Sequence, residues 1–370
     1  MLKVLELFGG IGACTKALKR LNIPHKVVDY VEIDKYAVKS YNAINETNFE
    51  PQDITKWDKD IDVDLIMHGS PCQDFSLAGS QAGGDEGSGT RSSLMYETIR
   101  IVEKLNPKYV IWENVKNVLS KKHVHNFNQY IDYLTKLGYT SYFKVLNARN
   151  YGIPQNRERI FVLSIKNDID IFYNFPEPLE LKIKLNDLLE DEVDEKYYLS
   201  EKMKEYIVAN NEKWTGNNDK SLINKEVAST INTAEGTRRC DASNYICKGL
   251  PNDFDLKLLI KNATKKGYEE GYPGDSVNLT YPNSKTRRGR VGKQVAQTLE
   301  TQCNQGVILK NLRIRKLTPK ECFKLMGFDD IDFENASKVN SNTQLYKQAG
   351  NSIVVNVLEG IFKNLLMKDN

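Results

Sequence analysis

A cysteine lies in the stretch GSPCQDFSLAG, residues 69–79, directly after a proline and directly before a glutamine. The apolar run VDLIMHGS precedes this loop, so Cys72 follows a predicted strand. A cysteine in an accessible loop can act as a thiolate nucleophile, whereas a cysteine packed in a core is chemically inert. No C-x-x-C pair occurs among the six cysteines, which argues against a zinc site and a disulfide framework. The position of Cys72 alone does not decide between these two roles.

Two kinds of segment alternate along the chain up to about residue 165, and these are the elements that must position Cys72. Short β-branched runs, such as KVLELF, KVVDYVEI, DLIMHGS and KYVIWEN, are each followed by a segment with helical periodicity. This alternation predicts an α/β fold with a doubly wound, mostly parallel sheet. Ligands of such sheets bind at the carboxyl ends of the strands, where we expect the functional loops.

Composition limits the class of protein. The chain has 370 residues, of which 40% are hydrophobic and 27% charged, which predicts a globular protein of two domains. No apolar run approaches the roughly 20 residues of a membrane span, and no signal-peptide pattern opens the chain, so a cytoplasmic protein without a membrane partner is expected. The net charge of +3 permits a local patch that binds a polyanion.

The character of the sequence changes after YNFPEPLE. An acidic stretch leads into irregular sequence rich in Asn, Gly, Thr and Arg, and the final segment NSIVVNVLEGIFKNLLMK has helical periodicity again. We therefore predict a discontinuous first domain, residues 1–178 plus 336–370, and a smaller, irregular second domain, residues 179–335.

A glycine turn in LELFGGIGA joins the first predicted strand to a helix. Gly10 and Gly12 allow a ligand to approach the backbone, although the third glycine of the dinucleotide fingerprint is missing. Glu32 in YVEID ends the second strand, where a carboxylate can accept hydrogen bonds from ribose, and Asp53 in PQDI can accept one from an adenine amino group. Alone, these motifs fit a nucleoside site and a plain βαβ unit equally well.

Four further motifs occur in a fixed order: PCQ, ENV, QNRER and, after a long insert, AGNSIVVNV. With this combination the chain resembles a cytosine-C5 DNA methyltransferase of the bacterial restriction-modification or phage type, over nearly its whole length apart from residues 179–290. The resemblance implies a Rossmann-like, S-adenosylmethionine-dependent catalytic domain, residues 1–178 plus 336–370, and a target-recognition domain, residues 179–335. It implies transfer of a methyl group to carbon 5 of a flipped cytosine in a short specific double-stranded DNA sequence, with S-adenosylhomocysteine as product and no metal.

The resemblance also assigns catalytic roles. Cys72 forms the covalent adduct with the cytosine, because carbon 5 is a poor nucleophile until a thiolate adds at carbon 6. Glu113 meets N3 of the base, Arg159 contacts O2, and Arg157 orders the loop that carries Cys72. A surface ion pair is the alternative for the two arginines.

For the cofactor, the resemblance implies ten contacts: Phe8, Gly10, Gly12, Glu32, Ile33, Asp53, Ile54, Pro71, Asn351 and Ile353. Many members of the family have an aromatic residue at the position of Ile33. Adenine stacking is replaced here by weaker aliphatic packing, so we expect a looser cofactor site.

The basic stretch SKTRRGRVGK suits DNA phosphates, and Thr298-Leu299 resembles the Thr-Leu pair of the family's recognition domain. The expected DNA contacts are Gln73, Ser76, Arg91, Arg238, Arg239, Arg287, Arg288, Arg290 and Thr298. A solvated charged surface is the alternative for each arginine.

Two other functions compete with DNA methylation: methylation of transfer RNA by the same machinery, and DNA binding without catalysis. The intact catalytic residues Cys72, Glu113, Arg157 and Arg159 argue against a pure binding protein. We expect a monomer that is encoded by a bacterium or phage, acts on double-stranded DNA and is a candidate companion of a restriction endonuclease of the same site.

Overall fold

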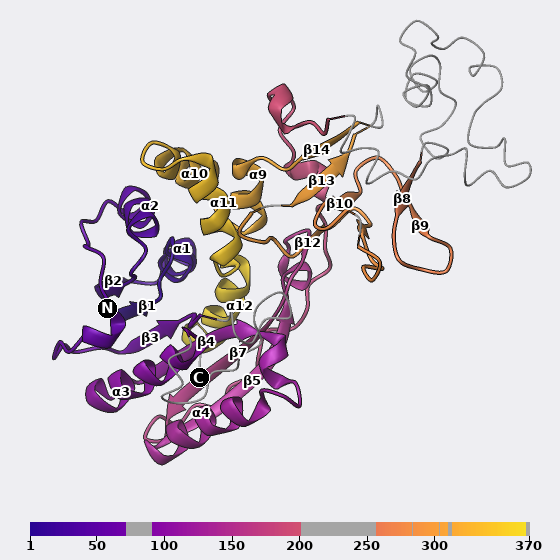
Figure 1. Ribbon diagram of the computed structural model, residues 1–370. Helices are drawn as coiled ribbons and strands as arrows, with labels where there is room; N and C mark the ends of the chain where they lie inside the picture. The colour runs from indigo at the N-terminus through magenta and orange to yellow at the C-terminus, as the bar shows by residue number, and fades with distance from the viewer. Residues whose placement is uncertain (72–90, 201–256, 283, 303, 310–312, 368–370) are drawn as a thin grey trace, which may run out of the picture. The chain divides into compact units, whose positions relative to one another are not determined.

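The computed structural model describes residues 1–71, 91–200, 257–282, 284–302, 304–309 and 313–367, with the side chains of Arg91 and Ser92 excepted. It divides into two compact units (Figure 1). Unit 1 comprises Met1–Ile153, Arg157–Lys182 and Phe323–Asn370, and unit 2 comprises Pro154–Asn156 and Ile183–Cys322. Residues 323–335, which we expected in the second domain, therefore belong to unit 1.

The sheet of unit 1 has six strands in the order β2-β1-β3-β4-β7-β5. They are β1 (Leu2–Leu7), β2 (His25–Val31), β3 (Leu65–His68), β4 (Tyr109–Val115), β5 (Tyr139–Asn147) and β7 (Glu158–Lys166). Strands β1 to β4 are parallel, whereas β7 pairs antiparallel with both of its neighbours. The predicted mostly parallel α/β sheet is confirmed. Strand order reverses at β1 and β3, which is where such sheets bind ligands.

Helices cover both faces of this sheet. They are α1 (Ala13–Arg20), α2 (Lys35–Asn45), α3 (Met95–Leu105), α4 (Val124–Lys136), α10 (Asp330–Ser337), α11 (Asn342–Asn351) and α12 (Val355–Leu366). Helices α3 and α4 bury their apolar residues against one face, where Trp112 and Tyr130 are fully buried. Helix α12 packs beside α1 on the other face, so the last helix of the chain completes the first unit (Figure 1).

The described part of unit 2 contains short strands, which pair antiparallel except for β12 with β6. A four-stranded sheet has the order β11-β10-β13-β14, and two pairs, β8-β9 and β12-β6, accompany it. The strands are β6 (Gln155–Asn156), β8 (Leu258–Lys261), β9 (Tyr268–Gly271), β10 (Ser276–Asn278), β11 (Val291–Gly292), β12 (Ala296–Gln297), β13 (Gln305–Ile308) and β14 (Ile314–Lys316). Helix α9 (Pro319–Leu325) follows β14 and runs into unit 1.

A buried ion pair stabilises the end of unit 2. Arg315 on β14 donates two hydrogen bonds to the Glu321 carboxylate on α9, at 2.9 and 2.7 Å. Both side chains are almost completely buried, and the same carboxylate accepts the Thr318 backbone N–H at 2.8 Å. Because both charges are desolvated, removal of either partner leaves a costly unpaired charge.

None of the described helices is long and apolar enough to cross a membrane.

Candidate functional site

Glu113 and Arg159 meet at the carboxyl edge of the unit 1 sheet. In the antiparallel pairing of β4 with β7, Glu113 lies opposite Phe161, so Arg159, two residues away, shares its face as a diagonal neighbour. Arg159 Nε lies 3.1 Å from Glu113 Oε1. Burial raises the pKa of the Glu113 carboxyl, and the charges of Arg159 and Arg157 oppose this shift. The site therefore combines a buried acid with a fixed cation.

The loop predicted to carry the nucleophile begins beside this pair. A methyl group built at Gly69 would lie 3.6 Å from Glu113 Oε2 and 3.5 Å from Ile353 Cδ1. Gly69 thus brings three predicted motifs together: the start of the cysteine loop, the carboxyl group and the C-terminal segment. Cys72 itself lies outside the described residues.

Ser70 anchors the start of the same loop to β4. The Trp112 indole N–H donates to Ser70 Oγ at 3.0 Å, and the Asn114 amide donates to the Ser70 carbonyl at 3.3 Å. All three residues are buried. Because Trp112 and Asn114 flank Glu113 on β4, one strand positions both the carboxyl group and the loop. Sequence analysis did not identify this anchor, although a tryptophan in a buried strand requires a partner for its N–H.

Arg157 has a different partner from Arg159. Its guanidinium donates to the carbonyls of Gly350 at 3.0 Å and Ser352 at 2.8 Å, and the residue is only 4% exposed. It thereby holds the turn between α11 and α12, which carries Ile353. The surface ion pair considered for this arginine is not what the structure contains.

The predicted cofactor residues of the first βαβ unit gather around Glu32. The Glu32 carboxylate accepts the backbone N–H of Gly10 at 3.2 Å and of Asp34 at 2.9 Å. Burial raises its pKa, against the effect of these hydrogen bonds. Gly10 has φ 55°, and a Cβ built there meets no atom within 4 Å, so open space lies above the turn. Ile33 beside it is 69% exposed.

The remaining cofactor predictions fall in different environments. Asp53 caps a short 3-10 turn, with its carboxylate accepting from the Thr55 backbone at 3.0 Å and hydroxyl at 2.8 Å. The Ile54 side chain is buried in the core, and its carbonyl accepts a hydrogen bond from the Arg100 guanidinium at 3.0 Å. Phe8 and Pro71 are half-buried, Gly12 caps α1 and Asn351 is exposed.

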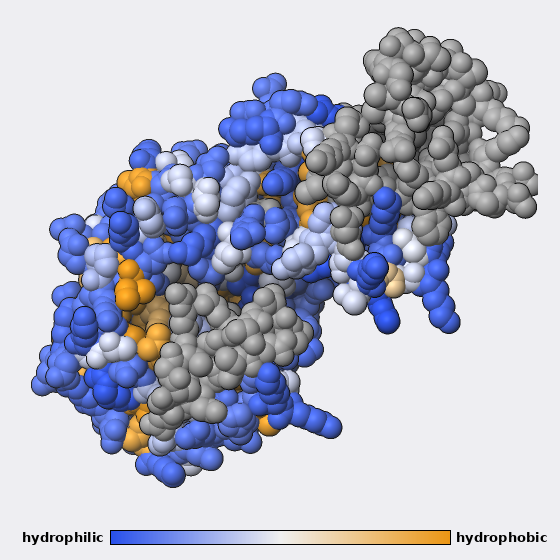
Figure 2. Space-filling model, in the orientation of Figure 1, coloured by the Kyte–Doolittle hydropathy of each residue, from blue (hydrophilic) through white to orange (hydrophobic). Residues whose placement is uncertain are grey.

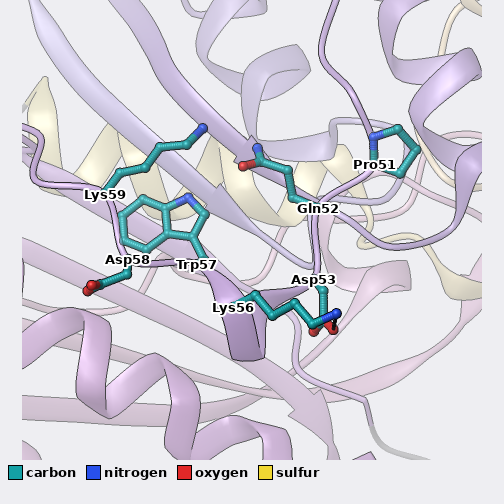
Figure 3. A pocket seen from close by; sticks show the side chains of 7 residues that line it. All are labelled: Pro51, Gln52, Asp53, Lys56, Trp57, Asp58 and Lys59. Atoms are coloured by element: carbon teal, nitrogen blue, oxygen red, sulfur yellow. Dashed lines mark ion pairs between the residues drawn. The ribbon is translucent and has the colours of Figure 1, made fainter.

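A pocket of about 370 Å³ lies on the connection that carries Asp53 (Figure 3). Its lining is Pro51, Gln52, Asp53, Lys56, Trp57, Asp58 and Lys59. The Trp57 indole N–H and Lys59 both bond the buried Asp29 carboxylate, each at 2.7 Å. Charges of both signs around this pocket are thus paired locally. Asp53 is the only residue in the pocket lining that we predicted as a cofactor contact.

Two glutamines organise the predicted Thr-Leu pair in unit 2. Gln155 Oε1 accepts the Leu299 backbone N–H at 3.1 Å, and Thr298 donates its hydroxyl to the Asn156 carbonyl at 2.9 Å. Gln305 donates to the carbonyl of Thr298 at 3.0 Å. The QNRER motif therefore begins in unit 2, on β6 beside β12, although its arginines belong to unit 1.

The predicted DNA contacts divide into three groups. Arg288 is exposed and Arg287 half-buried. Arg290, by contrast, is 1% exposed and donates to backbone carbonyls, so the structure does not leave it available to DNA. Apart from Thr298, which is half-buried, the others lie outside what the structure describes: Gln73, Ser76, Arg238, Arg239 and the side chain of Arg91.

Comparison with known proteins gives a single family. The family model "C-5 cytosine-specific DNA methylase" matches residues 2–367. A type II methyltransferase of Lactococcus lactis subsp. cremoris, M2.ScrFI, is 34% identical over 99% of both chains. The orphan methyltransferase M.SPRI of Bacillus phage SPR is 33% identical, over 99% of this chain and 97% of its own.

Solved structures support the same fold. A methyltransferase of Entamoeba histolytica, EhMeth, aligns with a TM-score of 0.61 at 16% identity, over 100% of this chain and 99% of its own. The "putative DNA modification methyltransferase encoded within prophage" of E. coli aligns with a TM-score of 0.61 at 20% identity, over 100% of both chains.

Proposed function

Because this chain belongs to the family of C-5 cytosine-specific DNA methylases, we propose that its catalytic centre consists of Cys72, Glu113, Arg157 and Arg159. The chain is a DNA cytosine-C5 methyltransferase. The observation that supports this centre best is the Glu113–Arg159 contact of 3.1 Å beside Gly69, where the cysteine loop begins.

In the proposed reaction, the Cys72 thiolate adds to carbon 6 of the flipped cytosine and breaks the C5=C6 π bond. Carbon 5, now the nucleophilic end of an enamine, would take the methyl group from the sulfonium of S-adenosylmethionine, as the methyl–sulfur bond breaks and a neutral thioether leaves. Loss of the proton from carbon 5 then restores the double bond and expels the thiolate. The sulfur therefore returns to its starting state, and each turnover releases one proton.

Glu113, Arg159 and Arg157 each support this reaction in a different way. The raised pKa keeps a proton on Glu113 at higher pH than on a free glutamate, so the carboxyl group can donate to N3 as negative charge develops there. Arg159, fixed against Glu113, offers its remaining N–H groups to O2. Arg157 acts at a distance from the base, by holding the turn before Ile353.

The family uses S-adenosylmethionine, and the residues of the first βαβ unit fit that ligand. When bound, it supplies the methyl group on a sulfonium. Open space above Gly10 leaves room for the methionine part, and the buried Glu32 carboxyl can accept from ribose hydroxyls. Asp53 has a second oxygen besides the one that caps its turn, and exposed Ile33 offers an aliphatic surface to the adenine.

We propose unit 2 as the domain that recognises a short specific sequence of double-stranded DNA. Its exposed basic residues, Lys285 and Arg288, support phosphate contact. The relatives include type II and orphan methyltransferases, so a restriction endonuclease of the same site is a partner to look for. We further propose a cytoplasmic monomer of a bacterium or phage-infected cell.

The proposal is tested by bisulfite sequencing of DNA from a methylation-free host that expresses the protein. Conversion-resistant cytosines within one short motif are expected with the wild type. The Cys72→Ser variant should give complete conversion while it still binds DNA, and the buried Cys14→Ser variant serves as the matched control with methylation retained. Methylation by Cys72→Ser would refute the covalent step.

A further inference from the structure

A buried arginine shapes one loop of unit 2, residues 278–290. The Arg290 guanidinium donates to four backbone carbonyls: Asn278 at 3.0 Å, Thr280 at 3.1 Å, Tyr281 at 2.7 Å and Pro282 at 3.3 Å. The Glu269 carboxylate accepts the backbone N–H groups of Arg290 and Val291. The Arg290 guanidinium thus forms its hydrogen bonds inside the protein, and these bonds fix the turn that precedes Arg290.

The residue presented by this turn is Tyr281. Its φ of 48° lies in the left-handed region, which is unfavourable for a bulky aromatic residue and easily adopted by glycine or asparagine. Its side chain is 73% exposed, so burial in unit 2 does not offset this strain. Neither the local backbone nor packing favours a tyrosine here, and a strained residue held by its surroundings points to function.

The charge around Tyr281 indicates what it meets. The same loop carries Lys285, Arg287 and Arg288, and no described carboxylate forms an ion pair with any of them. The coloured part of the surface in Figure 2 is mostly hydrophilic, with small separate apolar areas. An aromatic ring beside these cations suits duplex DNA, which offers base edges in its grooves and phosphates beside them.

We infer that Tyr281 is a specificity-determining residue, whose side chain contacts the groove edge of one base pair in the DNA recognition sequence. Lys285 and Arg288 contact neighbouring phosphates, and Arg290 is the positioning residue that holds Tyr281 in its left-handed conformation. This inference rests on the proposed role of unit 2 in DNA recognition. It replaces the expected Arg290–DNA contact with an indirect role for that arginine.

The test compares Tyr281→Ala with Phe172→Ala, a control that removes an equally exposed ring from unit 1. The value of kcat/KM is measured on a duplex with the methylated site and on duplexes with single base-pair changes in that site. Loss of one base contact should lower kcat/KM on the correct site about 5- to 150-fold. It should also abolish discrimination at one base pair, while the Phe172 variant matches the wild type.

A third variant separates function from folding. Tyr281→Asn should keep or raise the Tm, because asparagine tolerates the left-handed backbone, yet lose the same discrimination as Tyr281→Ala. Retained discrimination in either Tyr281 variant, or an equal loss on every duplex, would overturn the inference. Absence of DNA methylation by the wild type would instead refute the proposed function.

Discussion

The Glu113 site of unit 1 and the 278–290 loop of unit 2 both depend on an arginine side chain, half-buried Arg159 in the first and buried Arg290 in the second, but the two regions differ in how they are positioned. Arg159 faces a carboxylate across two paired strands, whereas Arg290 contacts only carbonyls of its own loop. Strand register fixes the first arrangement, and a single side chain fixes the second. In the proposed function, the catalytic chemistry is thus placed on the sheet, and the contact that must differ between DNA targets is placed on a loop.

The largest expected effect concerns the Glu113 site on the sheet of unit 1. Glu113→Gln should lower kcat by about 10²- to 10⁴-fold, since the amide cannot supply the proton to N3. Single-turnover methylation of the wild type and the variant measures it, with S-adenosylmethionine binding as the control for folding. A loss below tenfold would show that the carboxyl group is dispensable.

The ion pair of unit 2 comes next. Glu321→Gln removes the negative charge and leaves the buried Arg315 guanidinium unpaired, which should destabilise unit 2 by about 3–5 kcal/mol. Urea unfolding followed by a probe in unit 2 tests this value. If the variant unfolded at the wild-type urea concentration, the pair would contribute specificity rather than stability.

A third prediction concerns pH. Burial raises the pKa of Glu6 to about 7, despite hydrogen bonds from Thr15 and Tyr41. The folded protein keeps this proton while the unfolded chain loses it near pH 4.5, so stability falls as pH rises from about 4.5 to 7. The full cost is about 3 kcal/mol. Glu6→Gln should remove this part of the pH dependence, as urea unfolding at pH 5 and pH 8 will reveal.

The anchor of the cysteine loop should give a smaller effect. Trp112→Phe keeps the ring but removes the N–H that bonds Ser70, at a cost of about 1–2 kcal/mol in stability. We expect kcat to fall several-fold with the KM for S-adenosylmethionine unchanged. A change in that KM alone would place the role of Trp112 in cofactor binding instead.

The smallest effect is expected at the cofactor site. Ile33→Trp should tighten S-adenosylmethionine binding about 2- to 10-fold, because an aromatic ring can stack on adenine. Calorimetric titration of both proteins measures it, with Ile33→Leu as the matched control. Equal affinity of wild type and Ile33→Trp would mean that the present site is not loose.

The sequence predicted the Glu113 site of unit 1 much better than the 278–290 loop of unit 2. The alternation of apolar strands with amphipathic helices predicts the parallel sheet, and motifs that follow strands must converge at one edge. Glu113 and Arg159 meet for this reason. Arg290 lies in a run of similar arginines, and its burial depends on four carbonyls presented by a turn 8 to 12 residues before it. The roles of Gln155 and Gln305 could not be predicted either, because no local sequence pattern marks a side-chain amide that forms hydrogen bonds with backbone groups elsewhere.

Covalent trapping on a duplex with 5-fluorocytosine at the methylated position tests the central claim most directly. Fluorine at carbon 5 cannot leave as a proton does, so the adduct between protein and base should persist once the methyl group has been transferred. The account predicts a stable adduct on the peptide that contains Cys72, reduced in Glu113→Gln and absent in Cys72→Ser. An adduct that survives Cys72→Ser, or wild-type enzyme that methylates ordinary DNA without trapping, would contradict it.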